Sequence, residues 1–193
     1  MLQALYNRTM RLAAKPHAEL ALGAVSFTES SFFPIPPDAL LIPMVLADKA
    51  KAWRFAFICT VTSVLGGLAG YLIGALLFEQ IARPILEIYG YAGKFADFAQ
   101  RYNAWGAWIV LIAGLTPFPF KIITIASGAT HLNLVTFLIF SIIARGGRFY
   151  AVAGLLYLVG PPIRQFIEKR LGLVFTLGLA ALLGGFVAVR YLL

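Results

Sequence analysis

Four prolines and two acidic residues interrupt an apolar stretch of the chain, residues 27–43 (FTESSFFPIPPDALLIP). The prolines are Pro34, Pro36, Pro37 and Pro43, and the acids are Glu29 and Asp38. Each proline within a helix removes a backbone donor and its ring clashes with the preceding turn, so one straight membrane-spanning helix is not expected here. Non-helical backbone at membrane depth is tolerated only where protein or a water-filled cavity satisfies its polar groups. We therefore predict a broken or re-entrant element that lines a site.

The composition defines the surroundings in which this stretch must fold. Of the 193 residues, 61% are hydrophobic and 12% are charged, and the mean hydropathy is +0.86. These values lie outside the range of ordinary soluble domains and predict an integral membrane protein with one membrane domain. The formal net charge is +8, but most basic residues fall in short segments between apolar runs. That pattern is typical of topology signals and of contacts with anionic lipid headgroups, so we expect membrane lipids and no nucleic acid as partners.

Apolar runs alternate with polar connectors along the chain. We predict an N-terminal interfacial helix at 1–19, a re-entrant hairpin at 20–48, a transmembrane helix at 55–78, an extracytoplasmic amphipathic segment at 79–104, a second re-entrant hairpin at 107–130, a transmembrane helix at 131–160 and a C-terminal transmembrane helix at 171–193. The expected fold is an all-α integral membrane protein, with two proline-broken hairpins, about three full spans and interfacial amphipathic helices.

The second predicted hairpin resembles the first. Its apolar run is interrupted by Pro117 and Pro119, and each hairpin is followed by a span that contains a Gly-Gly pair. Pro37 and Pro117 precede the first glycine of their pair by the same separation, and Phe55 and Phe137 open the apolar part of each span. Paired interrupted segments indicate an inverted repeat with a transporter site near the bilayer midplane. The prolines expected to shape the hairpins are Pro34, Pro36, Pro37, Pro117 and Pro119.

Glycines predict where the spans pack closely. Gly66, Gly70 and Gly74 recur at every fourth position on one face of the first span, where small residues let another backbone approach. Gly146 and Gly147 lie in the second span between two arginines, where they would let a ligand or a hairpin come close.

The distribution of basic residues favours hairpins that turn back. If both proline-broken runs do so, nine lysines and arginines lie on the side of the N-terminus and four lie on the other side. Runs that crossed would instead move the basic connector at 49–54 to the outside. The positive-inside rule therefore places the N-terminus in the cytoplasm and the C-terminus outside.

Five ionisable residues fall at or near membrane depth under this topology: Glu29, Asp38, Lys121, Arg145 and Arg148. Each charge at the centre of a helix costs about 2.5–3.5 kcal/mol on insertion scales, so these residues should face inward and find partners. Three positive and two negative charges leave a net positive site, and the planar fork of arginine suits phosphate. We predict that Lys121, Arg145 and Arg148 bind the phosphate of a headgroup, while Glu29 and Asp38 form ion pairs or carry protons.

A purely structural alternative fits the same charges, because buried ion pairs can serve only to pin the hairpins. Ser30 and Ser31 lie beside Glu29, but hydroxyls near a broken helix commonly serve its backbone. His17 and His131 have no matching ligand cluster, and Cys59 is the only cysteine. With no nucleophile, metal or cofactor constellation, the sequence predicts neither an enzyme nor a bound cofactor.

Several of these motifs together resemble the DedA family, also called the SNARE-associated or VTT-domain family. They are Glu29 followed by Pro36, Pro37 and Asp38, the span with GGLAGYLIG, and the segments GLTPFPFKIITIASGAT and RGGRF. The short chain and the RGGRF segment are similar to its small YqaA-like branch. The resemblance implies a multi-pass protein of the inner (plasma) membrane with two facing re-entrant hairpins. It also implies relatives that move polyprenyl-phosphate carriers and phospholipids across bilayers, in some cases coupled to the proton gradient.

The functional groups of that family carry over to Glu29 and Asp38 in the first proline motif, to Lys121 in the second, and to Arg145 in the following span. Leu115 stands where many relatives have an arginine, and Lys121 stands where they often have one. The resemblance therefore implies a phosphate site that is weaker or is tuned to another headgroup.

We expect a membrane transporter or flippase for a phosphate-bearing lipid, either a polyprenyl phosphate or a phospholipid, with proton coupling as an option. Two other functions fit the sequence. One is a non-transporting membrane factor that supports envelope assembly or division through partners, and the other is a small-ion or solute/proton exchanger. The sequence leaves open whether the chain forms homo-oligomers.

Overall fold

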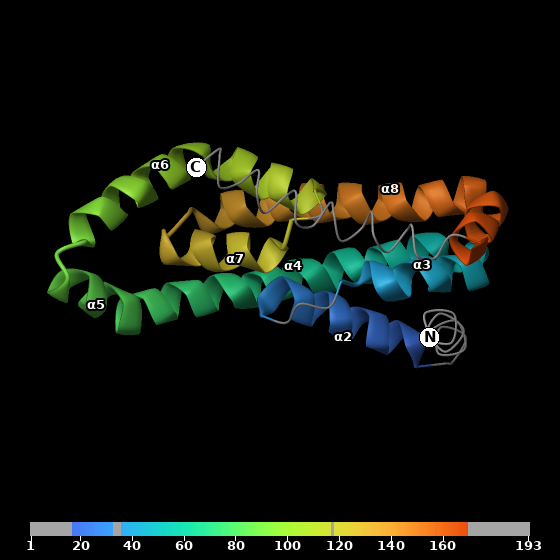
Figure 1. Ribbon diagram of the computed structural model, residues 1–193, viewed down its shortest axis with the longest axis horizontal. Helices are drawn as coiled ribbons and strands as arrows, with labels where there is room; N and C mark the ends of the chain where they lie inside the picture. Colours follow the sequence, from blue (N-terminus) through green and yellow to red (C-terminus); the bar gives the residue numbers. More distant parts are fainter. Residues whose placement is uncertain (1–16, 33–35, 117, 170–193) are drawn as a thin grey trace.

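The computed structural model describes residues 17–32, 36–116 and 118–169 (Figure 1). The C-terminal span expected at 171–193 and most of the N-terminal helix expected at 1–19 lie outside the described residues, as do Pro34 and Pro117.

Every regular element of the described residues is helical, which confirms the predicted all-α class. The helices are α2 (Ala18–Ser31), α3 (Asp38–Ala47), α4 (Ala52–Leu77), α5 (Arg83–Ile88), α6 (Ala92–Leu115), α7 (Phe120–Ala129) and α8 (Leu134–Lys169). A 3-10 turn, η1 (Lys49–Lys51), precedes α4, and a π-helical turn, η2 (Phe78–Ala82), follows it.

Two helical hairpins enter the molecule from opposite ends (Figure 1). α2 runs toward the middle of the long axis and α3 runs back, while α6 and α7 do the same from the other end. Prolines stand where the returning helices begin: Pro37 directly precedes α3, and Pro119 directly precedes α7. Proline is tolerated at a helix start because the amide it lacks would have no intrahelical partner there.

α6 differs from the segment boundaries that the sequence suggested. It runs unbroken from Ala92 to Leu115, so part of the amphipathic segment expected at 79–104 and the beginning of the hairpin expected at 107–130 form one helix. α5 joins α6 through a turn at Gly90, whose φ of 72° is a conformation that glycine adopts without steric cost.

The two halves of the chain share a register of 82 residues. This separation relates the starts of α3 and α7, at Asp38 and Phe120, and those of α4 and α8, at Ala52 and Leu134. The predicted match of Phe55 with Phe137 fits this register. The predicted match of Pro37 with Pro117 is wrong by two residues, because the last proline before each helix sets its start and Pro119 fills that role in the second half. The paired elements run in opposite directions along the molecule (Figure 1).

α4 is the central helix, and its glycines let two other helices approach it closely. A Cβ atom at Gly66 would lie 2.1 Å from the carbonyl oxygen of Phe27 in α2. A Cβ atom at Gly74 would lie 2.0 Å from the carbonyl oxygen of Ile125 in α7, and one at Gly70 would lie 2.3 Å from Thr124 Oγ1. No side chain fits at such distances, so α2 and α7 pack directly on the backbone of α4.

The glycines of α8 are less crowded. A Cβ atom at Gly146 would lie 3.6 Å from Thr60 Cγ2, an ordinary contact, and one at Gly147 would lie 3.3 Å from Leu115 Cδ2. The geometry of α8 therefore does not require glycine at position 146.

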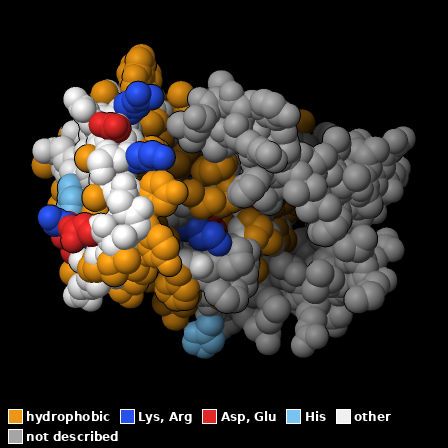
Figure 2. Space-filling view, turned by 60° about the vertical axis from the view of Figure 1, so that its left-hand side comes forward, with side chains coloured by type: hydrophobic (Ala, Val, Ile, Leu, Met, Phe, Trp, Pro, Cys, Tyr) orange, Lys and Arg blue, Asp and Glu red, His pale blue; other side chains and the backbone are white. Residues whose placement is uncertain are grey.

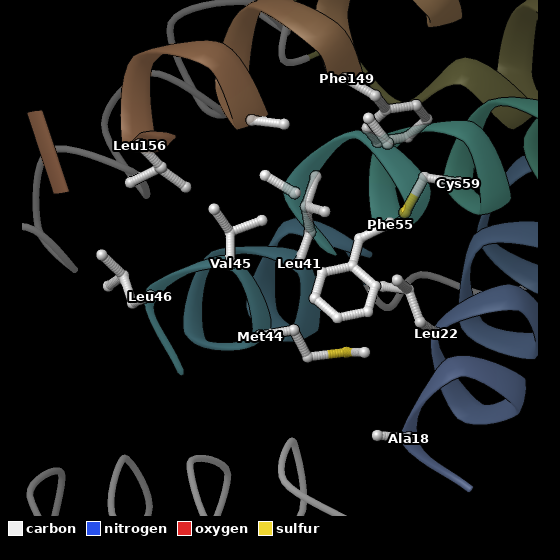
Figure 3. Packing of buried hydrophobic residues seen from close by; sticks show 13 residues of the cluster. Ala18, Leu22, Leu41, Met44, Val45, Leu46, Phe55, Cys59, Phe149 and Leu156 are labelled. Atoms are coloured by element: carbon white, nitrogen blue, oxygen red, sulfur yellow. The ribbon is translucent and has the colours of Figure 1, made fainter. Parts of the chain in front are cut away.

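Two apolar clusters fill the spaces beside α4. In the first, shown in Figure 3, Leu41 and Val45 of α3 pack with Phe55 of α4 and with Phe149 and Leu156 of α8. The second joins α6, α7 and α8 and contains Tyr102, Val110, Ala113, Phe120, Ile123, Leu132 and Phe137. The first cluster thus fixes α3 against α8, and the second fixes α7 against α6.

Two stretches of continuous helix are long and apolar enough to cross a membrane, Lys49–Ile88 with 40 residues and Leu134–Val159 with 26 residues. Hydrophobic side chains also cover much of the described surface in Figure 2, and charged side chains gather toward one side of that face. Apolar surface of this extent is typical of protein in contact with lipid.

Candidate functional site

The most deeply buried charge in the described residues is Arg145, on α8. Its side chain is fully buried, and its Nη2 donates a hydrogen bond of 2.9 Å to Glu29 Oε2 from α2. Its Nε donates a second bond, of 2.6 Å, to the hydroxyl of Ser63 on α4. Arg145 therefore joins the first hairpin to both long helices.

Aromatic rings complete the surroundings of Arg145. The guanidinium carbon lies 5.0 Å from the ring centre of Phe120, at the start of α7, and 4.7 Å from that of Phe149. Such cation–π contacts contribute about 0.5–2 kcal/mol each, more where water is excluded. Nη1 is also buried, and it has no hydrogen-bond partner among the described residues. The guanidinium thus keeps donor capacity that neither Glu29 nor Ser63 uses.

Arg148 forms a second and more open ion pair. Its Nη2 contacts Asp38 Oδ2 at the start of α3, and its Nη1 donates to the carbonyl oxygen of Thr116, 3.0 Å away, between α6 and α7. About a fifth of each charged side chain is exposed. Asp38 lies in the first turn of α3, where the positive end of the helix dipole stabilises a carboxylate. Arg148 therefore connects the tips of both hairpins.

Lys121 stands apart from these pairs. It lies in the first turn of α7, is half-buried, and makes no ion pair or side-chain hydrogen bond with the described residues. Of the five predicted membrane-depth charges, four thus form two acid–arginine pairs, and Lys121 carries the remaining positive charge.

Two hydroxyl residues belong to the site although the sequence analysis gave them no such role. Ser30 Oγ lies 2.7 Å from Ser63 Oγ and donates to Glu29 Oε2 at 3.2 Å. Ser30 was expected to serve its own helix backbone, and Ser63 was not singled out at all. The available signal was that Ser63 is a polar residue one turn before Gly66, on the face where α2 packs.

The described residues contain no group of three or more histidine, cysteine or acidic side chains that could hold a metal ion. Glu79 and His131 do meet, with Oε1 and Nε2 3.1 Å apart, but they do so at the exposed end of α7, away from the two acid–arginine pairs. The contacts observed within the site are charge pairs and hydrogen bonds.

Opposed helical hairpins thus lie on two long apolar helices, with acid–arginine pairs between them, and helices of this length and composition can cross a membrane. The family model of the VTT domain matches residues 35–158, and the chain belongs to this family, the DedA family, as its motifs predicted. The family is membrane-associated, and its members are generally thought to be transporters or flippases.

Two relatives extend this likeness over most of the chain. An uncharacterized protein of Haemophilus influenzae (strain ATCC 51907 / DSM 11121 / KW20 / Rd) is 34% identical over 170 residues, which cover 88% of this chain and 88% of the relative. An uncharacterized protein of Histophilus somni is 37% identical over 168 residues, which cover 85% of this chain and 87% of the relative. No solved structure matches the chain significantly.

Proposed function

We propose that this protein is a transporter of the inner membrane that moves a phosphate-bearing lipid, a polyprenyl phosphate or a phospholipid, between leaflets with proton coupling. The observation that carries the proposal is the state of Arg145. A fully buried guanidinium with an uncommitted Nη1 lies where the two hairpins meet, and Lys121 adds positive charge on the neighbouring helix. A phosphate group matches both the charge and the donor geometry.

Helix lengths support a re-entrant arrangement of both hairpins. α3 and α7 have 10 residues each, which span about 15 Å at a rise of about 1.5 Å per residue, or half of a hydrocarbon core about 30 Å thick. The tips of such hairpins end near the bilayer midplane, while α4 and α8 cross it. Paired half-length elements that run in opposite directions are the arrangement of inverted-repeat transporters.

The proposed cycle is an exchange of partners on the arginines. Removing one partner of a buried ion pair costs about 3–5 kcal/mol, because the other charge is left uncompensated. A phosphate that replaces Glu29 avoids this cost, since the arginine passes from one anion to another, and the cost at the partly exposed pair of Asp38 with Arg148 is smaller. The displaced carboxylate is then neutralised by a proton, which couples headgroup binding to proton uptake.

The different exposure of the two arginines determines the order in which the headgroup meets them. Arg148 and Asp38 are partly exposed, whereas Arg145 is fully buried behind Phe120. The headgroup meets Lys121 and Arg148 first and reaches Nη1 of Arg145 next, while the lipid tail stays in the membrane.

A reconstitution assay tests the proposal. The protein is placed in vesicles of phosphatidylethanolamine and phosphatidylglycerol that contain a fluorescent polyprenyl phosphate or a fluorescent phosphatidylglycerol, and leaflet exchange is followed by external quenching. We expect exchange with the wild type, loss with Arg148→Ala and Glu29→Ala, and wild-type rates with Arg83→Ala, which removes an exposed arginine far from the site. Equal rates in all four proteins would contradict the proposal. Ion flux driven by a pH gradient without exchange of either lipid would identify an exchanger instead.

A further inference from the structure

We propose, resting on the proposed function, that Ser63 is a positioning residue of the transport site. Its hydroxyl accepts from Arg145 Nε at 2.6 Å and lies 2.7 Å from the hydroxyl of Ser30, which in turn is 3.2 Å from Glu29 Oε2. With the direct bond of 2.9 Å from Arg145 Nη2 to the same carboxylate oxygen, these contacts close a ring of four side chains.

The directions of the hydrogen bonds in this ring are determined by chemistry. Guanidinium can only donate and a carboxylate can only accept, so Ser63 accepts from Arg145 and Ser30 donates its single proton to Glu29 Oε2. Ser30 can then only accept from Ser63, which uses its own proton for that bond. Glu29 Oε2 receives two donors, one from Arg145 and one from Ser30, and it must be the unprotonated oxygen of the carboxyl group.

It follows that the ring can exist only while Glu29 accepts through Oε2. If a proton occupies Oε2, both donors lose their acceptor, and the hydroxyls must turn to find others. A buried donor left without a partner is destabilising, so the ring and a protonated Oε2 exclude each other. Ser63 thereby links the position of Arg145 on α8 to a proton-free Oε2 of Glu29 on α2.

Other hydroxyls of the same helix interface show that this role is not general. Ser26 donates to the carbonyl oxygen of Cys59 at 2.8 Å, and Ser31 donates to that of Gly66 at 3.0 Å. Both bonds join α2 to α4 through the backbone and contact no charged group. Ser63 and Ser30 differ because each contacts a member of the buried ion pair.

The second hairpin reaches the ring through Thr124 of α7. Its hydroxyl lies 3.1 Å from the carbonyl oxygen of Ser30 and 2.9 Å from that of Lys121, in its own helix. One proton cannot serve both acceptors fully, so the contact to Ser30 can be exchanged for the local one. Thr124 thereby joins α7, the helix that carries Lys121, to the residue that follows Glu29 in α2.

A double-mutant cycle tests the ring without any transport assay. The apparent Tm in detergent is measured for Ser63→Ala, Glu29→Gln and the double variant, and the same is done with Ser26→Ala in place of Ser63→Ala. We expect the Tm losses of Ser63→Ala and Glu29→Gln to be strongly non-additive and those of Ser26→Ala and Glu29→Gln to be additive. Ser30→Ala replaces Ser63→Ala if the latter does not fold. Additive losses in the Ser63 or Ser30 cycle would overturn the proposal, whether or not the protein transports lipid.

Exchange of the fluorescent phosphatidylglycerol or polyprenyl phosphate then separates positioning from structural support. Because Ser63 does not contact the headgroup, Ser63→Ala should lower the maximal rate about tenfold, the scale of one hydrogen bond to a charged group, and leave the half-saturating lipid fraction unchanged. Ser63→Thr, which keeps the hydroxyl, should restore the rate. Ser141→Ala, which removes a buried hydroxyl with no partner among the described residues, should have no effect.

A Ser63→Ala exchange rate equal to that of Ser141→Ala would refute the positioning role of Ser63. If the wild type exchanges no lipid but the double-mutant cycle shows coupling between Ser63 and Glu29, the transport function is refuted and the hydrogen-bonded ring is retained.

Discussion

The two short returning helices, α3 and α7, occupy matching places in the two halves of the chain and are attached by different means. At its first residue, α3 is held by the ion pair of Asp38 with Arg148, and further along by apolar side chains. α7 is held by direct backbone contacts, since Gly74 leaves no room for a Cβ atom beside Ile125, and Gly128 leaves none beside Tyr71. Another anion can replace Asp38 in the ion pair with Arg148, whereas close packing of two backbones has no substitute partner. In the proposed cycle, exchange of anionic partners therefore falls to α3, and α7 serves as rigid support.

The largest expected effect comes from Arg145, which touches both hairpins. Arg145→Ala leaves Glu29 buried without its partner and opens space beside Phe120. We expect a loss of about 3–5 kcal/mol in the free energy of unfolding, the usual cost of breaking a buried ion pair. Thermal unfolding in detergent measures it. A Tm equal to that of the wild type would show that the pair does not hold the hairpins.

The steric attachment of α7 is tested by Gly74→Ala. The added methyl would lie 2.0 Å from the carbonyl oxygen of Ile125, so α4 and α7 must separate, at a cost of about 1–3 kcal/mol. Gly146→Ala is the matched control, because its methyl meets only Thr60 Cγ2 at 3.6 Å. Equal stability of the two variants, compared by thermal unfolding, would remove the contrast between α3 and α7.

A smaller effect on stability is expected at α3. Asp38→Asn keeps the shape of the side chain but removes its charge, and the pair with Arg148 is partly exposed. The loss should be about 1 kcal/mol or less, while lipid exchange should fall much further because partner exchange needs the carboxylate. Stability and exchange rate are measured on the same preparation. A loss of stability as large as that of Gly74→Ala would mean that α3 is as firmly fixed as α7.

The smallest effect concerns the far end of α7, where Glu79 meets His131. Glu79 lies just beyond the span expected at 55–78, and the hydrogen bond from His131, followed by that from Arg83, lowers its pKa below the usual 4.5. A lowered carboxyl pKa stabilises the fold above pH 4.5, and this contribution is lost as the pH falls through the folded-state value. Glu79→Gln should therefore lower the Tm slightly at pH 7 and by less in acid. A difference that stays undiminished at a pH below the folded-state pKa of Glu79 would contradict this assignment.

Part of this architecture could be predicted from residue types alone. The all-helical class and the family follow from the apolar composition and the two proline motifs, and both predictions are confirmed. The match of Phe55 with Phe137 fits the observed register, whereas the match of Pro37 with Pro117 does not, because only the last proline before a helix sets its start. The continuity of α6 was not anticipated either, since the change from polar to apolar composition near Trp105 resembles a boundary, yet no residue there breaks a helix.

The partners within the site were beyond the reach of sequence patterns. Which acid meets which arginine depends on how α2, α3 and α8 cross, and no spacing along the chain encodes that. Ser63 was missed for the same reason, because its two side-chain partners lie on other helices. Lys121 is the opposite case, a residue predicted for the site on its charge alone. Unlike the two arginines, it makes no ion pair in the described part of the chain.

The register of 82 residues has a consequence for symmetry. Ser63 and Arg145 are separated by this same number of residues, and their side chains are in contact. Where two units are related by half a turn, a residue can touch its own counterpart only close to the rotation axis, so the axis passes between these two side chains. The charge on Arg145 has no equal on the other unit. The two units are therefore not equivalent at the point where they meet, so conformations that interchanged their roles would differ in energy.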